Sequence, residues 1–230
     1  MTLYLIPTPL GDDAMATIPG YVQEITHSLG HFIVERAKTA RQFIKATKHP
    51  TPMPELELVE LNEHDQKEAV IFFKEMVKAG HSVGLMSEAG CPAVADPGAA
   101  IVALAHQLGV AVVPLVGPSS ILLALMGSGF SGQQFCFHGY LSAKQPAAEL
   151  KQLETESQRK KQTQIFIETP YRNRAMVDAA FKNLAPNTRF CIAMDLTLPT
   201  EYIKTYKISE WKTIELPEIH KKPAVFLLFA

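Results

Sequence analysis

Apolar positions in the first half of the chain follow two alternating patterns. Short apolar or period-two runs, typical of strands, occupy 2–9, 31–35, 50–61, 81–88 and 110–117. Apolar residues at helical spacing occupy 18–30, 39–47, 65–80 and 98–109. A chain that alternates strand and helix in this way favours a parallel sheet covered by helices. We therefore predict an N-terminal α/β domain with a parallel sheet.

The second half is less regular. Helical patterns occur at 119–129, 147–158 and 171–185, and strand patterns at 135–141, 163–169, 189–197, 201–211 and 224–230. These elements predict a second α/β domain with a mixed sheet. The breaker segment "PLVGPSS" interrupts the pattern near residues 114–120, so we expect domains at 1–115 and 116–230. Two such domains are expected to meet at a cleft, and clefts between domains are common ligand sites.

Composition limits the class of protein. The chain has 230 residues, 47% hydrophobic and 20% charged, which is enough to form one large or two small cores. No apolar run reaches the length of a membrane span, and the start lacks the pattern of a secretory signal. Three widely spaced cysteines argue against a disulfide scaffold. We expect a cytoplasmic protein.

Charge is distributed unevenly between the halves. Residues 1–115 carry 8 Lys/Arg and 13 Asp/Glu, whereas residues 116–230 carry 14 and 10. If an anionic polymer binds, the C-terminal half is the better surface, with basic segments at 157–162 and 219–222. Ordinary variation between two solvated surfaces explains the same numbers.

Three segments rich in proline and glycine each follow a predicted strand. We name them the first bend (7–13), the second bend (87–98) and the third bend (116–120). Ligands of open parallel sheets bind beyond the carboxyl ends of strands, so these bends are expected to share one site. Neither GxGxxG nor GxxxxGK[ST] is present, and no lysine or arginine stands beside the glycines. A ligand without phosphates, held largely through backbone groups, fits this pattern.

The order of motifs resembles one known family. Six segments are similar to motifs of the tetrapyrrole-methylase superfamily of S-adenosylmethionine-dependent methyltransferases. In chain order they are "LYLIPTPLGD", "LMSEAGCPAVADPG", "VVPLVGPSS", "IFIETPYR", "AMDLT" and "AVFLLF". The branch that methylates a ribose 2′-hydroxyl of a cytidine in small-subunit ribosomal RNA is the best match. That branch typically has "ATPIGN", "AEDTR", "HEHN", "SDAGTPLISDPG", "PGPSA" and "ESPHR". The resemblance covers almost the whole chain.

The resemblance implies that S-adenosylmethionine binds in the cleft between the domains. Glu88 replaces the acid of the family that holds this cofactor, and Cys91 supplies a nearby backbone contact. The full set of cofactor-binding candidates is Leu10, Glu88, Cys91, Ser119, Ser120, Phe166, Ala193, Met194 and Pro223.

The acceptor motifs depart from the family pattern. In "VERAKTAR", Glu35 is kept, but Arg36 stands where aspartate is usual and Lys38 where arginine is usual. "LNEHD" replaces "HEHN", and Tyr171 replaces a histidine in "ETPYR". The methyl-donor motifs are retained while the acceptor site is altered.

A hydroxyl acceptor loses its proton during methyl transfer, so a nearby base would assist. The candidates for this role are His64, Glu35 and Glu168. Each has a structural alternative: a surface histidine, an ion pair of Glu35 with Arg36 or Arg41, and a carboxylate at a helix start. His27 and His31 lack further ligands nearby, so no metal site is expected.

We expect a methyltransferase that acts on a ribose 2′-hydroxyl of ribosomal RNA. Two alternatives stay open: the same chemistry on a small molecule such as a tetrapyrrole, and a protein that binds the cofactor without catalysis. The apolar segments "ILLALM" (121–126) and "AVFLLF" (224–229) are compatible with a homodimer or with a core role.

Overall fold

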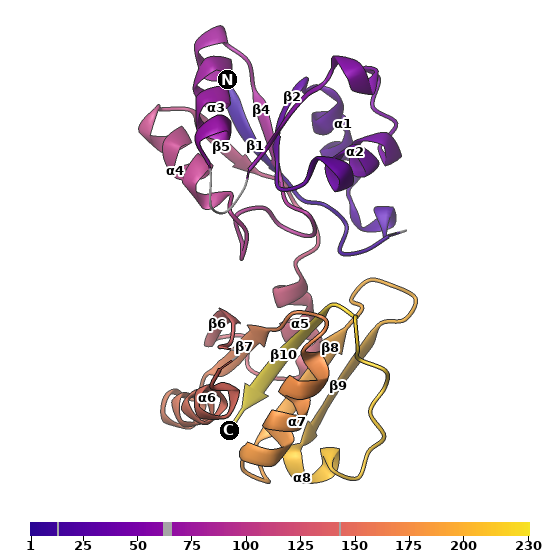
Figure 1. The fold of residues 1–230 in the computed structure, drawn as a ribbon, viewed down its shortest axis with the longest axis vertical. Coiled ribbons are helices and arrows are strands. Elements are labelled where there is room, and N and C mark those ends of the chain that lie inside the picture. Colours follow the sequence, from indigo (N-terminus) through magenta and orange to yellow (C-terminus); the bar gives the residue numbers. More distant parts are fainter. Residues whose placement is uncertain (13, 62–65, 143) are drawn as a thin grey trace. The chain divides into compact units, whose positions relative to one another are not determined.

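The structure is a computed structural model that describes residues 1–12, 14–61, 66–142 and 144–230. The chain forms two compact units, Met1–Ser119 and Ser120–Ala230 (Figure 1). None of the helices in these ranges is long and apolar enough to cross a membrane.

The N-terminal unit is built on a parallel sheet of order β3-β2-β4-β1-β5. Its strands are β1 (Thr2–Ile6), β2 (His31–Val34), β3 (Glu57–Glu60), β4 (Val83–Met86) and β5 (Ala111–Pro114). Its helices are η1 (Met15–Thr17), α1 (Gly20–His27), α2 (Ala37–Ala46), η2 (Met53–Glu55), α3 (Lys67–Ala79) and α4 (Ala99–Gln107). The predicted parallel α/β architecture is confirmed.

Helices cover both faces of this sheet (Figure 1). Successive residues of a strand point to opposite faces, so the apolar residues of one strand pack against helices on both sides. On β2, Phe32 and Val34 pack with α1 and α2, whereas Ile33 packs with α3 and α4. Helix α3 stops where Gly80 adopts φ +84°, a left-handed conformation that glycine tolerates at a helix end.

The C-terminal unit has a mixed sheet of order β6-β7-β10-β8-β9, as predicted. Its strands are β6 (Phe135–Tyr140), β7 (Thr163–Ile167), β8 (Arg189–Met194), β9 (Tyr202–Lys207) and β10 (Ala224–Phe229). Its helices are α5 (Ser120–Ser128), α6 (Pro146–Lys160), α7 (Asn173–Asn183) and α8 (Ile208–Trp211).

The core of the C-terminal unit lies between the sheet and helices α6, α7 and α8. Phe226 of β10 stacks between Phe166 of β7 and Phe190 of β8. The strand pattern over 201–211 ends earlier than expected, because residues 208–211 form α8. The Glu210 side chain accepts the Lys207 N–H at 2.8 Å, and Trp211 is buried in the core.

The three bends meet at one edge of the N-terminal unit, because parallel strands place their carboxyl ends together. Thr8 and Gly90 exchange two backbone hydrogen bonds, of 2.9 and 3.0 Å, which join the first bend to the second. The Cys91 thiol donates to the Pro118 carbonyl at 3.4 Å, which joins the second bend to the third. Gly117 packs so tightly on Pro7 that an added Cβ would lie 2.2 Å from Pro7 Cγ.

The substitution Gly117→Ala tests this contact. The Pro7 ring is rigid, so the clash should lower the free energy of unfolding by about 2 kcal/mol. Urea unfolding provides the measurement. Gly30→Ala is the matched control, because an added Cβ there meets open space; it should change stability by less than about 0.5 kcal/mol. Equal stabilities for the two variants would contradict the close approach.

Candidate functional site

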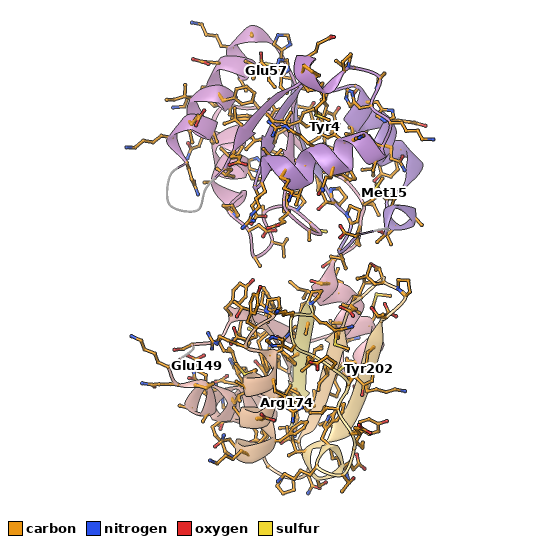
Figure 2. All side chains as sticks on the ribbon, turned by 45° about the vertical axis from the view of Figure 1, so that its right-hand side comes forward. Tyr4, Met15, Glu57, Glu149, Arg174 and Tyr202 are labelled. Carbon is orange, nitrogen blue, oxygen red and sulfur yellow. The ribbon has the colours of Figure 1, made fainter. Side chains whose placement is uncertain are left out.

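A cavity of about 320 Å³ opens beside the first two bends. The cavity lies at the edge of the N-terminal sheet where the strands have their carboxyl ends. Figure 2 shows this placement, because Met15, which lines the cavity, lies at the opposite end of the unit from Glu57, which begins β3. The lining residues are Thr8, Pro9, Leu10, Gly11, Asp12, Ala14, Met15, Thr39, Gln42, Phe43, Ala46, Glu88 and Ala89.

The lining suits a cationic, partly apolar ligand. Leu10, Met15 and Phe43 supply apolar surface, and the two charged residues, Asp12 and Glu88, are both acids. Among the described lining residues none is a lysine or arginine. This composition agrees with a ligand that carries no phosphate and favours one that carries a positive charge.

Backbone geometry brings two predicted acids together beside this cavity. Glu35 follows β2 and Glu88 follows β4, and these strands are neighbours in the sheet. The Glu88 N–H donates to Glu35 Oε2 at 2.7 Å. Arg36 Nε lies 3.4 Å from Glu88 Oε2, so the observed ion pair involves Glu88 and not Glu35.

A third carboxylate, Asp96, was missed by the sequence analysis. It belongs to the second bend and lies beside Glu35 in a small recess. Burial, together with repulsion by Glu35 and Glu88, raises the pKa of Asp96 to about 6, although a hydrogen bond from the Ser87 hydroxyl opposes the shift. A carboxyl group that titrates near neutral pH is suited to accept a proton. The sequence signal was the second acid of "SEAGCPAVADPG".

The second bend holds an unusual backbone conformation. Gly90 has φ +80°, and an added Cβ there would lie 3.1 Å from Leu10 Cδ2. Ala93 (φ +66°) and Ala95 (φ +64°) are also left-handed, which costs an alanine about 1 kcal/mol or more. The bend therefore keeps its shape through contacts with its surroundings.

The other two cofactor candidates of the N-terminal unit differ in placement from Leu10 and Glu88, which line the cavity. Cys91 and Ser119 are half-buried, and neither is among the residues that line the cavity. Burial raises the pKa of the Cys91 thiol, and Asp96 adds to this effect. Cys91 is therefore a packing residue and a weak nucleophile. Ser120 begins α5.

In the C-terminal unit, the cofactor candidates differ in burial. Phe166, Ala193 and Met194 are buried within β7 and β8, so only their backbone could meet a ligand without rearrangement of the core. Pro223 precedes β10 and is exposed. The register of β10 with β7 and β8 places Pro223 close to the ends of both strands.

Two ion pairs lie at that same edge of the C-terminal sheet. The Glu168 side chain is 1% exposed, and its Oε2 lies 2.8 Å from Arg172 Nη2. Asp195, also buried, accepts from Lys222 Nζ at 2.5 Å and from Thr200 Oγ1 at 2.8 Å. The carboxylate of Glu168 thus already has a counter-ion, the Arg172 guanidinium.

The remaining sequence candidates lie elsewhere. His64, the first candidate for a base, belongs to residues 62–65 and lies outside the described residues. His27 lies on α1, where its Nε2 contacts the Thr47 carbonyl, whereas His31 lies on β2 beside His81. The described residues contain no group of three or more potential metal ligands.

Residues 2–212 match the sequence family described as Tetrapyrrole (Corrin/Porphyrin) Methylases. The chain therefore belongs to this family of methyltransferases, which confirms the predicted resemblance. Ribosomal RNA small subunit methyltransferase I of Bacillus subtilis is 31% identical, over 90% of this chain and 68% of its own length. The protein of that name from Vibrio cholerae is 28% identical, over 98% and 75%.

Solved structures show the same fold. Diphthine synthase has a TM-score of 0.69 at 17% identity, and the alignment covers 100% of this chain and 90% of that one. Uroporphyrin-III C-methyltransferase from Thermus thermophilus, complexed with S-adenosylhomocysteine, has a TM-score of 0.58 at 16% identity, over 100% and 97%.

The pKa of Asp96 makes a prediction about stability. The carboxyl group loses its proton near pH 4 in the unfolded chain and near pH 6 in the folded one. The folded state therefore holds the proton more tightly, and stability falls as pH rises through this window. Asp96→Asn should remove that fall and raise stability at pH 8, measured by urea unfolding from pH 4 to 8. The control Asp178→Asn, on the surface of α7, should keep it. Identical pH curves for wild type and Asp96→Asn would contradict the assignment.

The buried Glu168 makes a second prediction. Arg172→Met would leave its carboxylate without a counter-ion and should lower the free energy of unfolding by about 3 kcal/mol. Arg174 pairs with Asp178 on the exposed face of α7 (Figure 2), so Arg174→Met should cost less than about 1 kcal/mol. Adding Glu168→Gln to Arg172→Met should recover much of the loss. No recovery would show that Arg172 acts through packing alone.

Proposed function

We propose that this protein is an S-adenosylmethionine-dependent methyltransferase that modifies a ribose 2′-hydroxyl of ribosomal RNA. The observation that carries the acceptor is similarity, over nine-tenths of the chain, to a protein named ribosomal RNA small subunit methyltransferase I. A ribosomal substrate would place the protein in the cytoplasm.

The cavity of the N-terminal unit supports the donor. S-adenosylmethionine, when bound, supplies an activated methyl group on a cationic sulfonium. Leu10 would pack against it, Glu88 and Asp12 would complement its charge, and Gly90 would leave room for backbone contact. The relative that carries S-adenosylhomocysteine shares this fold. The proposed cofactor set is completed by Cys91, Ser119, Ser120, Phe166, Ala193, Met194 and Pro223.

A base near the acceptor hydroxyl is the second requirement of the chemistry. We retain His64, Glu35 and Glu168 for this role and add Asp96. Glu35 and Asp96 lie together in the recess at the strand ends, and the raised pKa of Asp96 matches the task. Glu168 is the weakest of these, because its carboxylate is buried against Arg172.

A second candidate function is cofactor binding without catalysis. Arg36 stands where the family has aspartate, and its guanidinium pairs with Glu88 at 3.4 Å. That contact places a cation on the acid proposed to hold the cofactor. Labelling experiments separate the two functions, because only an enzyme transfers the methyl group.

A homodimer is the expected assembly. The segment "AVFLLF" is β10, whose residues lie in the core, so it is not available for this contact. Helix α5 differs, because Met126 is 78% and Leu122 49% exposed. We propose that this face of α5 contacts a second copy of the chain.

Substitution of Glu88 tests the donor site. Titration calorimetry with S-adenosylmethionine should show binding by the wild type, and Glu88→Gln should weaken it about tenfold or more through loss of a charged partner. Glu75→Gln, on the exposed face of α3, is the matched control and should leave affinity unchanged. Equal affinities for all three proteins would remove Glu88 from the site.

Labelled methyl transfer tests the acceptor with the same proteins. Deproteinised small-subunit ribosomal RNA, intact small subunits and a uroporphyrinoid are the three substrates. A methylated ribose resists alkaline cleavage, so hydrolysis of labelled RNA identifies the acceptor atom. Label in the uroporphyrinoid alone would assign a small-molecule acceptor, and binding without label would support the second candidate.

A further inference from the structure

Helix α2 carries a concentration of positive charge that the net charge of its unit hides. Residues 36–48 contain five of the eight cations found in residues 1–115, and no acid. Three lie on α2 itself, and Arg36 and Lys48 flank it. All five side chains belong to exposed residues. Charge counted over each half of the chain favours the C-terminal half for an anionic polymer, whereas this local concentration lies in the N-terminal half.

The three cations of α2 occupy one face of the helix. Lys38, Arg41 and Lys45 follow the spacing i, i+3, i+7, which places them in a row along a helix. The opposite face, with Phe43 and Ile44, is buried in the core. At 1.5 Å per residue the row is about 10 Å long, so it presents a line of positive charge along which a nucleic-acid strand could place neighbouring phosphates. We call Lys38, Arg41 and Lys45 the basic row.

Intramolecular pairing does not account for the basic row. Within the described parts of the chain, none of its three members forms an ion pair. The basic end of α6 differs, because Arg159 and Lys160 both pair with Glu156, at 2.9 and 2.6 Å. Lys38 also lies in the first turn of α2, where the helix dipole disfavours a cation. Of the three, Lys45 alone lies in the last turn, where the dipole favours a cation, so charge stabilisation of α2 does not account for the row as a whole.

The basic row adjoins the cavity. Thr39, Gln42 and Ala46 of α2 line the cavity, and each follows a member of the row directly in sequence. An extended anion held on α2 would thus lie next to the methyl-donor site. A small molecule inside the cavity would not need these cations, because they do not line it.

We propose that Lys38, Arg41 and Lys45 bind phosphates of the RNA strand that carries the methyl acceptor. The inference rests on the proposed function and adds the surface by which the RNA is held. Contacts of this kind position a strand beside a site and are independent of its sequence.

The test compares two triple variants that remove the same charge. Lys38→Gln/Arg41→Gln/Lys45→Gln alters the basic row, and Arg159→Gln/Lys160→Gln/Lys161→Gln alters the end of α6. Fluorescence anisotropy with deproteinised small-subunit ribosomal RNA gives the affinity at several salt concentrations. The α2 variant should bind about tenfold or more weakly, with a log–log salt slope shallower by about 2 (three contacts at about 0.7 each). The α6 variant should stay close to wild type.

Methyl-transfer kinetics provide a second measurement. The α2 variant should raise the KM for RNA, whereas its affinity for S-adenosylmethionine by calorimetry should stay within about twofold of wild type. That unchanged affinity also shows that the variant is folded, because the cavity includes residues of α2.

Each outcome bears on one proposal. Equal RNA affinities and salt slopes for the two triple variants would overturn the role of the basic row. Polyglutamate serves as the probe for an acidic protein. If the α2 variant lost polyglutamate binding while its RNA binding stayed unchanged, the row would be assigned to an acidic protein, and the proposed RNA contact would be overturned. If the wild type binds RNA through the row but transfers no methyl group, the row stands and the proposed enzymatic function fails. If it binds no RNA, both fail.

Discussion

The reciprocal hydrogen bonds between Thr8 and Gly90 are the interaction on which the candidate site depends. They join two bends that are eighty residues apart in sequence and that follow adjacent strands, β1 and β4. The Gly117–Pro7 contact then fixes the third bend against the first. The parallel sheet supplies the common edge, and these contacts turn neighbouring strand ends into one continuous surface. The cavity, the acids beside it and the position of α2 along its lining all follow from that arrangement.

The two units use charge differently at their sheet edges. Within the described residues of the N-terminal unit, Arg36 pairs with Glu88 and no other ion pair is formed by Glu35, Glu88 or Asp96, so negative potential remains to attract a cation. In the C-terminal unit, Glu168 and Asp195 are each matched by a basic side chain and are buried. Excess charge is typical of a binding surface, whereas matched buried charge is typical of a structural support. By this criterion the N-terminal edge has the charge of a binding surface, and the C-terminal edge has that of a structural support.

The sequence predicted the fold well because strand and helix periodicities, proline and glycine act locally. The parallel sheet, the mixed sheet and the meeting of the three bends all follow from residues that break or continue an element. Other features depend on contacts across the chain. The burial of Asp96 and the choice of Arg36 to pair with Glu88 depend on how the second bend folds back over β2 and β4. The basic row was hidden because charge was summed over half the chain, whereas helical spacing gathers it on one face.

The left-handed alanines of the second bend have a consequence for recognition. Ala93 and Ala95 hold conformations that an isolated alanine seldom adopts, and prolines at 92 and 97 restrict the backbone on either side. Such a loop is preorganised, because its conformational freedom is lost when the protein folds and not when a ligand binds. Ordering a flexible loop of similar length would cost roughly 1 kcal/mol or more per residue. Because the second bend is already ordered in the folded protein, a ligand that contacts it would bind without this entropic cost and therefore with higher affinity.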